Sequence, residues 1–291
     1  MTKESAQVFT LGHSPDPDDA FMFYAMAENK IDLRGYRFEH RLEDIQTLNE
    51  RALRGELHIS AISIHAYARV ASKYALLPCG ASMGDGYGPM AVRKRSTLNE
   101  ALVRDSTARN VLADKKVAVP GTMTSAFLAL QLFQGKFDYV VVPFDQIFGA
   151  VRTGRADVGL IIHEGQLTYE KSGFEKIVDL GEWWKETTGL PLPLGGNVVR
   201  KDIPAAVRKD LREIIRESID YGLAHREEAV RHSLPYARDM DAKLAGKFIG
   251  MYVNEFTRDY GRVGRDAIRR FLGEAHRKGY VDFPVEVEFV E

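Results

Sequence analysis

The sequence predicts an α/β protein of two lobes with a ligand cleft between them. Strand-like and helix-like segments alternate from the first strand onward, and this alternation starts afresh near Lys116. Beyond Ile203 the chain is mainly helical. A chain of 291 residues is long enough for two modest domains. We expect residues 1–109 and 195–291 to form the first lobe and residues 110–194 the second.

The first unit opens with a strand over residues 8–12 and a helix over 18–28. We expect Asp16 to cap this helix, because Asp is a preferred N-cap and Pro17 suits the first helical position. Asp18 and Asp19 then favour the positive end of the helix dipole. The alternation continues with strand 36–42, helix 44–54, strand 58–62, helix 63–71 and strand-like pieces at 75–78 and 89–93. Such alternation predicts a largely parallel sheet.

The second unit repeats the pattern and looks like a lobe with its own core. It comprises strand 116–119, helix 124–134, strand 139–142, helix 144–153 and strand 158–162. The segment 183–199, rich in Gly and Pro, is expected to carry the chain back to the first lobe. Apolar residues then recur at helical spacing in Leu211, Ile214, Ile215, Ile219 and Leu223.

Composition excludes several classes of function. Lys+Arg 40 against Asp+Glu 41 gives a net charge of -1, and no basic block stands out, so we expect no nucleic-acid binding. No apolar run approaches the roughly 20 residues of a membrane span. Residues 1–7 lack the pattern of an export signal, and we therefore expect a cytoplasmic protein. Cys79 is the only cysteine, which excludes an internal disulfide and predicts a buried apolar side chain.

Three turns that follow a strand and precede a helix predict the binding site. They lie at residues 14–16, 62–64 and 121–125, where the carboxyl ends of strands meet a ligand in open α/β sheets. Helix N-termini there offer backbone N–H groups to an anion, so a small organic acid is the expected ligand. The candidate binding residues are Ser14, Ser63, Gly121, Thr122, Thr124 and Ser125. The alternative for the Ser and Thr residues is helix capping alone.

Four motifs carry a resemblance to a known family. The segments 11–24, 119–126, 159–164 and 183–195 resemble, in order, the motifs of 1,4-dihydroxy-6-naphthoate synthases. The resemblance implies a class II periplasmic-binding-protein-like fold used as a lyase. It further implies cleavage of cyclic dehypoxanthinyl futalosine to 1,4-dihydroxy-6-naphthoate and dihydroxyacetone in menaquinone biosynthesis, without a cofactor. The family commonly has Ser-Pro-Cys-Pro-Asn-Asp near the first strand, whereas this chain has Asp16 and Asp18 at the Cys and Asn positions.

His163 matches the histidine that the family uses as its catalytic base. It follows the predicted strand 158–162, and an imidazole that titrates near neutral pH can take and return a proton. A zinc site of the His-Glu-x-x-His type is excluded because residue 167 is Leu, and we expect no metal. Glu164 is expected to point away from His163, on the other side of a strand.

Two other functions remain open from the residues alone. The first is a chorismate dehydratase-like lyase on the same fold, although the Ser-Tyr-Leu-Asn signature of that sister family has no counterpart here. The second is a non-catalytic protein that binds a small organic acid. The missing export signal argues against the second, since a binding protein that serves a transporter is exported.

Overall fold

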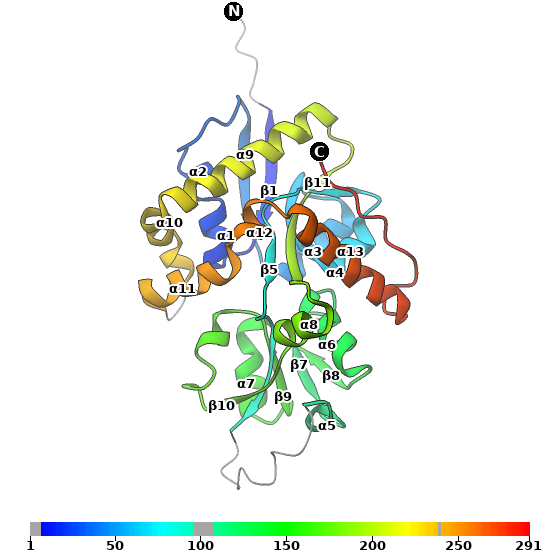
Figure 1. The fold of residues 1–291 in the computed structure, drawn as a ribbon. Helices are drawn as coiled ribbons and strands as arrows, with labels where there is room; N and C mark the ends of the chain where they lie inside the picture. Colours follow the sequence, from blue (N-terminus) through cyan, green and yellow to red (C-terminus); the bar gives the residue numbers. More distant parts are fainter. Residues whose placement is uncertain (1–6, 96–107, 238–239) are drawn as a thin grey trace, which may run out of the picture.

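The structure, a computed structural model, describes residues 7–95, 108–237 and 240–291, and these residues form two lobes, each built on its own β-sheet (Figure 1). The predicted two-lobed α/β architecture is therefore confirmed. Residues 1–6, 96–107 and 238–239, which we assigned to the first lobe, lie outside the described residues.

The sheet of the first lobe has the strand order β2-β1-β3-β11-β4, with β5 beside β11. Its strands are β1 (Val8–His13), β2 (Arg37–Leu42), β3 (Ile59–Ser63), β4 (Tyr74–Leu76), β5 (Ser82–Gly84) and β11 (Leu192–Arg200). β1 pairs in parallel with β2 and β3, whereas β11 is antiparallel to β3, β4 and β5. The expected parallel pairing thus holds for three strands only, because β11 returns from the second lobe and enters the sheet from the opposite end.

The sheet of the second lobe has the order β10-β6-β9-β7-β8. Its strands are β6 (Met90–Lys94), β7 (Val117–Val119), β8 (Tyr139–Val141), β9 (Val158–Ile161) and β10 (Phe174–Asp179). Around it lie α5 (Ala108–Leu112), α6 (Ser125–Gln134), η2 (Phe144–Gln146), α7 (Ile147–Arg152), η3 (Glu164–Leu167) and α8 (Leu180–Thr188). Here β7 is parallel to β8 and β9, and β6 is antiparallel to β9 and β10.

Two assignments made from the sequence were wrong. The strand at 89–93 was placed in the first lobe, but β6 belongs to the second sheet, where Met90 lies opposite Ile161. The segment 183–199 was expected to be a connection, but it contains most of α8 and of β11. Proline is tolerated inside β11 because the register shifts between Pro193 and Gly195, where the strand pairs with β5.

The helices of the first lobe cover both sides of its sheet (Figure 1). They are α1 (Pro17–Met22), α2 (Tyr24–Ala27), α3 (Ile45–Arg54), α4 (Ile64–Val70), α9 (Ala205–Ala224), α10 (Arg226–Ser233), η4 (Leu234–Tyr236), α11 (Ala242–Tyr252), α12 (Glu255–Arg258) and α13 (Gly261–Arg277). The single helix expected over 18–28 is broken at Phe23 into α1 and α2. The expected helical C-terminal part is confirmed, and α9 buries Leu211, Ile214, Ile215 and Ile219.

The two lobes share one hydrophobic core on one side of the molecule. Phe127 and Leu128 of α6 belong to the same buried cluster as Tyr67 of α4 and Phe271 of α13. We expected the second lobe to have a core of its own, and this was wrong for α6. The helix that opens the predicted anion site is therefore held by packing from the first lobe.

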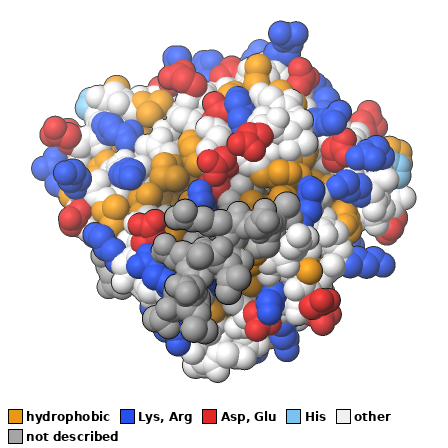
Figure 2. Space-filling model, turned by 60° about the horizontal axis from the view of Figure 1, so that its bottom comes forward, with side chains coloured by type: hydrophobic (Ala, Val, Ile, Leu, Met, Phe, Trp, Pro, Cys, Tyr) orange, Lys and Arg blue, Asp and Glu red, His pale blue; other side chains and the backbone are white. Residues whose placement is uncertain are grey.

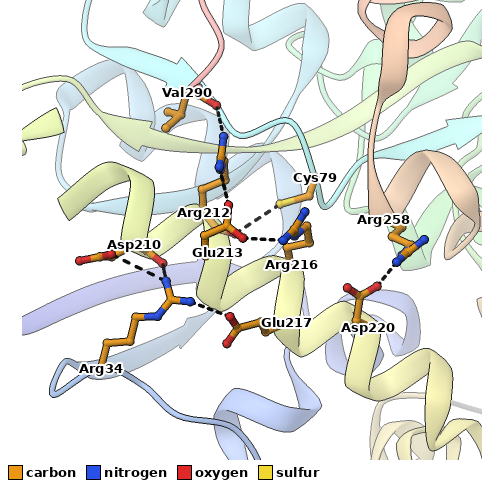
Figure 3. Close-up of polar contacts among 10 residues, drawn as sticks. All are labelled: Arg34, Cys79, Asp210, Arg212, Glu213, Arg216, Glu217, Asp220, Arg258 and Val290. Atoms are coloured by element: carbon orange, nitrogen blue, oxygen red, sulfur yellow. Dashed lines mark hydrogen bonds and ion pairs between the residues drawn. The ribbon is translucent and has the colours of Figure 1, made fainter. Parts of the chain in front are cut away.

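Cys79 lies against α9, as Figure 3 shows. Its Sγ donates a hydrogen bond of 3.7 Å to the carbonyl oxygen of Arg212, and burial raises the pKa of the thiol to about 12. The buried side chain predicted for Cys79 is confirmed. On the other side of α9, Arg34 contacts Glu217 at 2.6 Å and Asp210 at 3.8 Å, which ties the connection before β2 to this helix.

The surface carries charges of both signs. On the face in Figure 2, Lys and Arg side chains are interspersed with Asp and Glu over the described residues. Within the described part of the chain, none of the helices combines the length and the apolar character that crossing a membrane requires.

Candidate functional site

A cavity of about 120 Å³ lies between the lobes, at the ends of β1 and β3 and the start of α6. Four of the predicted binding residues surround it, namely Ser14, Ser63, Thr124 and Ser125. It is also lined by residues that were not among the candidate binding residues. These are Asp16, Asp18, Asp19, Ile45, Ala61, Ile62, Gly80, Ser82, Pro89, Ala126, Ile162, Leu194, Gly195, Gly196, Phe248 and Tyr252. Hydroxyl and carboxyl groups thus share the cavity with an apolar wall.

Gly121 and Thr122 are not among the lining residues, so the turn places only its later part at the cavity. A Cβ on Gly121 would lie 2.2 Å from Oε1 of Gln46, and its φ of +156° also favours glycine. The absence of a side chain lets Gln46, from α3 of the first lobe, accept a hydrogen bond of 3.3 Å from the N–H of Met123. Gly121 therefore permits a contact between the lobes.

Ser63 is oriented by Asn49, a residue that was not predicted from the sequence. The side-chain amide of Asn49 donates to Oγ of Ser63 at 3.0 Å, and its Oδ1 accepts from the N–H of Ser63 at 2.8 Å. Asn49 is fully buried on the same face of α3 as Leu48 and Ala52. A polar residue on the apolar face of a predicted helix was the signal that could have found it.

At the start of α6 the side-chain hydroxyls are already engaged. Oγ1 of Thr124 accepts from the N–H of Phe127 at 3.1 Å and donates to the carbonyl of Gly121 at 2.9 Å. Oγ of Ser125 donates to the carbonyl of Leu194 at 2.5 Å and accepts from the N–H of His65 at 3.1 Å. The groups left for an anion are the backbone N–H groups of the first helical turn, which have no partner within a helix.

Thr124 should therefore stabilise the protein as the N-cap of α6. We expect Thr124→Ala to lower the free energy of unfolding by about 1 kcal/mol, because the N–H of Phe127 loses its acceptor. Thr124→Ser keeps the hydroxyl and should stay within about 0.5 kcal/mol of the wild type. Chemical denaturation measures both values. Equal losses in the two variants would show that the methyl group, and not the cap, stabilises this turn.

The acidic turn after β1 binds Ser14 from two sides. The N–H of Ser14 donates to Oδ2 of Asp19 at 2.6 Å, and its hydroxyl donates to Oδ2 of Asp16. Asp16 occupies the N-cap position of α1, but its side chain makes no capping hydrogen bond, so the expected capping was wrong. Pro17 does begin the helix as expected. The side chain of Asp16 is turned toward Ser14 instead of toward the helix.

The carboxyl groups of this turn are hard to ionise. Burial, together with the neighbouring Asp16, raises the pKa of Asp18 to about 7, although the hydroxyl of Ser82 donates to it at 3.4 Å. Burial and the charge of Asp18 also raise the pKa of Asp19 well above its ordinary value. Near neutral pH the carboxyl of Asp18 is therefore present in both protonation states, which reduces its repulsion of an anion in the cavity.

This raised pKa makes stability depend on pH. The folded state holds the proton of Asp18 more tightly than the unfolded chain does. This difference raises the free energy of unfolding fully below the ordinary pKa of 3.8, and the contribution is lost as the pH rises toward about 7. We expect Asp18→Asn to be more stable than the wild type by about 1 to 2 kcal/mol at pH 8, and by less at pH 5. Unfolding curves at the two pH values measure this difference. A difference that is the same at both pH values would contradict the shift.

His13 lies behind Ser14, outside the residues that line the cavity. Its Nδ1 lies 3.2 Å from the carbonyl oxygen of Ser14, and its Nε2 lies 3.0 Å from Nδ1 of His40. Because a carbonyl oxygen only accepts, Nδ1 of His13 carries the proton and His40 donates to Nε2. Burial, with His40 beside it, lowers the pKa of His13 to about 3, so its ring is neutral and holds the Ser14 turn in place.

His163 lies at the start of η3, directly after Ile162 of the cavity wall, and does not itself line the cavity. Its side chain is 10% exposed. Its Nδ1 accepts a hydrogen bond of 3.0 Å from the N–H of Gly165, and its ring meets the edges of Phe144 and Phe148. In this geometry the neutral ring carries its proton on Nε2.

Glu164 was expected on the far side of a strand from His163, and this was wrong. β9 ends at Ile161, so Glu164 belongs to the 3₁₀ turn η3 and not to a strand. Its Oε2 lies 3.8 Å from Nδ1 of His163. The alternation of side chains along a strand does not apply to a turn.

Comparisons with known proteins agree over most of the chain. A family model described as menaquinone biosynthesis matches residues 9–277. A relative from Thermus thermophilus, 1,4-dihydroxy-6-naphthoate synthase, is 37% identical over 273 residues, which are 94% of this chain and 96% of the relative. Its namesake from Streptomyces coelicolor is 36% identical over 283 residues, with 95% and 96% covered.

Solved structures agree with the fold. A crystal structure from Archaeoglobus fulgidus is 40% identical, with a TM-score of 0.87, and the match covers 94% of this chain and 98% of that one. The periplasmic aliphatic sulphonate binding protein of Escherichia coli matches with a TM-score of 0.65 at 11% identity, covering 97% and 90% of the two chains. The second likeness concerns the fold alone, and it confirms the predicted periplasmic-binding-protein-like architecture.

Proposed function

This chain belongs to the menaquinone biosynthesis family, and from that premise we propose that it is a carbon–carbon lyase that acts on cyclic dehypoxanthinyl futalosine. The products are 1,4-dihydroxy-6-naphthoate and dihydroxyacetone. The observation that carries the proposal is the similarity to two synthases of that name, which covers 94% and 95% of this chain. The reaction takes place in the cytoplasm, in keeping with relatives that are biosynthetic enzymes.

The cavity suits a substrate that combines a carboxylate with an aromatic ring system. The substrate carboxylate binds at the start of α6, where the backbone N–H groups of Ser125 and Ala126 open the helix. The hydroxyl of Ser63, held by Asn49, is a second hydrogen-bonding group there. The ring system packs on the apolar wall formed by Ile45, Ile62, Ile162, Leu194 and Phe248.

His163 acts as the catalytic base in this proposal. It takes the proton of a substrate hydroxyl, the carbon–carbon bond breaks, and the bonding electron pair passes to the ring system, which is protonated as it becomes aromatic. Because Nδ1 of His163 accepts the N–H of Gly165, the ring must give up that contact to present an unprotonated nitrogen to the substrate. Binding therefore includes a rotation of the His163 side chain toward the cavity, while the backbone of η3 stays in place.

The decisive experiment compares two substrates. The purified protein is incubated with cyclic dehypoxanthinyl futalosine and, separately, with chorismate, and the products are identified by mass spectrometry. The proposal expects 1,4-dihydroxy-6-naphthoate from the first and no conversion of the second. Dehydration of chorismate would favour the sister activity on the same fold. Binding of either compound without conversion would favour a non-catalytic binding protein.

A further inference from the structure

A hydrogen bond between the lobes holds the turn that carries His163. Tyr252 ends α11 in the first lobe, and Gln166 lies in η3 of the second lobe. The hydroxyl of Tyr252 donates to Oε1 of Gln166 at 2.6 Å. The two residues are only 4% and 3% exposed, so water does not compete for this bond. Tyr252 also lines the cavity, which places the bond at the cavity wall.

The position of His163 depends on the same turn. η3 is a 3₁₀ turn of four residues, a length with little stability of its own. The N–H of Gln166 donates to the carbonyl oxygen of His163 at 3.0 Å, and the N–H of Gly165 donates to its Nδ1. The backbone of His163 is thus bound to Gln166, and the side chain of Gln166 is bound to the first lobe. Through this chain of contacts, Tyr252 fixes the backbone of His163 relative to the cavity, from which the side chain can turn toward the substrate.

The donor in this bond is held by packing and is protonated at neutral pH. The ring of Tyr252 meets the edges of Tyr87 and Phe248, with centroids 5.8 Å and 5.3 Å away. Burial raises the pKa of Tyr252 far above its ordinary value, so the hydroxyl carries its proton at neutral pH and can donate it to Gln166. The orientation of the hydroxyl is therefore set by packing on one side and by Gln166 on the other.

Packing alone does not account for a glutamine at this place. Within the described part of the chain, the buried Nε2 of Gln166 has no hydrogen-bond partner. An unsatisfied buried amide destabilises a protein, and an apolar side chain of similar size would avoid that cost. The Oε1 that receives Tyr252 is the part of Gln166 that an apolar residue cannot replace.

We infer that Tyr252 and Gln166 form a latch between the lobes that positions His163 for the reaction. The inference rests on the proposed lyase activity for its kinetic consequence, but not for its structural one. Both are positioning residues, because they act through the turn and not on the substrate. Breaking the latch leaves the anion site at α6 intact and lets the His163 turn move. The rate of the chemical step should therefore fall more than the affinity for the substrate.

The test removes the Tyr252 hydroxyl alone. Tyr252→Phe should lower kcat for naphthoate formation by about 10-fold and change KM by less than about 2-fold. Gln166→Leu should do the same. The double variant should lose no more than either single variant, since both act through one bond. The matched control is Tyr280→Phe, because the hydroxyl of Tyr280 also bonds across the lobes, to the carbonyl of Gln131 at 3.0 Å, away from the cavity. Its kcat should be unchanged.

A second readout separates the latch from the proposed reaction. Hydrogen exchange of the backbone amides in η3 should be faster by about 10-fold in Tyr252→Phe, and unchanged in Tyr280→Phe. Unchanged exchange in Tyr252→Phe overturns the inference, whatever the turnover. A normal kcat in that variant, or losses that multiply in the double variant, also overturns it. If the wild type forms no naphthoate, the proposed function fails, and hydrogen exchange alone decides on the latch.

Discussion

Replacing His163 by alanine is expected to lower kcat by about 10²-fold or more, with a smaller change in substrate affinity. This is the scale of a lost general base. The affinity should survive because the groups assigned to the substrate carboxylate and ring, around α6 and Ile162, do not include the imidazole. Single-turnover cleavage, followed with enzyme in excess, measures the chemical step without the contribution of product release.

The control for this prediction is another histidine. His225 is exposed and stacked on Tyr221 at the end of α9, outside the cavity, so His225→Ala should turn over normally. Near-normal turnover by His163→Ala would remove His163 from the role of base. In that case His13 and the carboxyl groups from Asp16 to Asp19 would be the remaining candidates, with Asp18 foremost because it titrates near neutral pH.

The largest loss of stability is expected from Gly181→Ala. Gly181 lies in the first turn of α8, where the chain that crosses between the lobes after β5 passes close by. A Cβ on Gly181 would lie 1.9 Å from the carbonyl oxygen of Tyr87 and 2.6 Å from the N of Gly88. Both obstacles are backbone atoms, which cannot rotate away as a side chain can. The crossing segment or the helix must shift, at a cost of about 3 kcal/mol.

Gly273→Ala is the matched control. Gly273 lies exposed in α13, and a Cβ there would meet nothing within 4 Å. Alanine is the better helix former, so this variant should gain up to about 1 kcal/mol. Urea unfolding curves of the two variants measure the opposite signs. Equal stability of Gly181→Ala and the wild type would mean that the crossing segment lies further from α8 than the structure places it.

The sequence predicted the parts of the fold that depend on local pattern. Strand and helix alternation predicted β1 to β4 and β7 to β9 and the helices between them, because hydrophobic period and turn residues are local properties. The alternation did not predict which strands pair with one another. The sequence of β6 is typical of a strand in whichever lobe it lies, and only its pairing with β9 and β10 assigns it to the second lobe. β11 was hidden because its prolines and glycines are typical of a connection, and a bulge accommodates them.

For the site, the same division between local and long-range information applies. The three turns after strands brought Ser14, Ser63, Thr124 and Ser125 to one cavity, as the strand-end rule predicts. The hydroxyls of Thr124 and Ser125 donate to backbone carbonyl groups instead of a ligand, and no local sequence pattern predicts these contacts. Tyr252 and Gln166 are 86 residues apart, and no local sequence pattern predicts their contact.

A crystal structure with bound product tests most directly the claim that the cavity between the lobes is the active site. A crystal structure of the protein with 1,4-dihydroxy-6-naphthoate should show the naphthoate between the lobes. Its carboxylate should accept hydrogen bonds from the backbone N–H groups of Ser125 and Ala126, and its rings should pack on Ile162 and Phe248. The imidazole of His163 should have turned toward the ring that lost the three-carbon fragment. Product bound outside this cavity, or bound with its carboxylate away from the start of α6, would contradict the account.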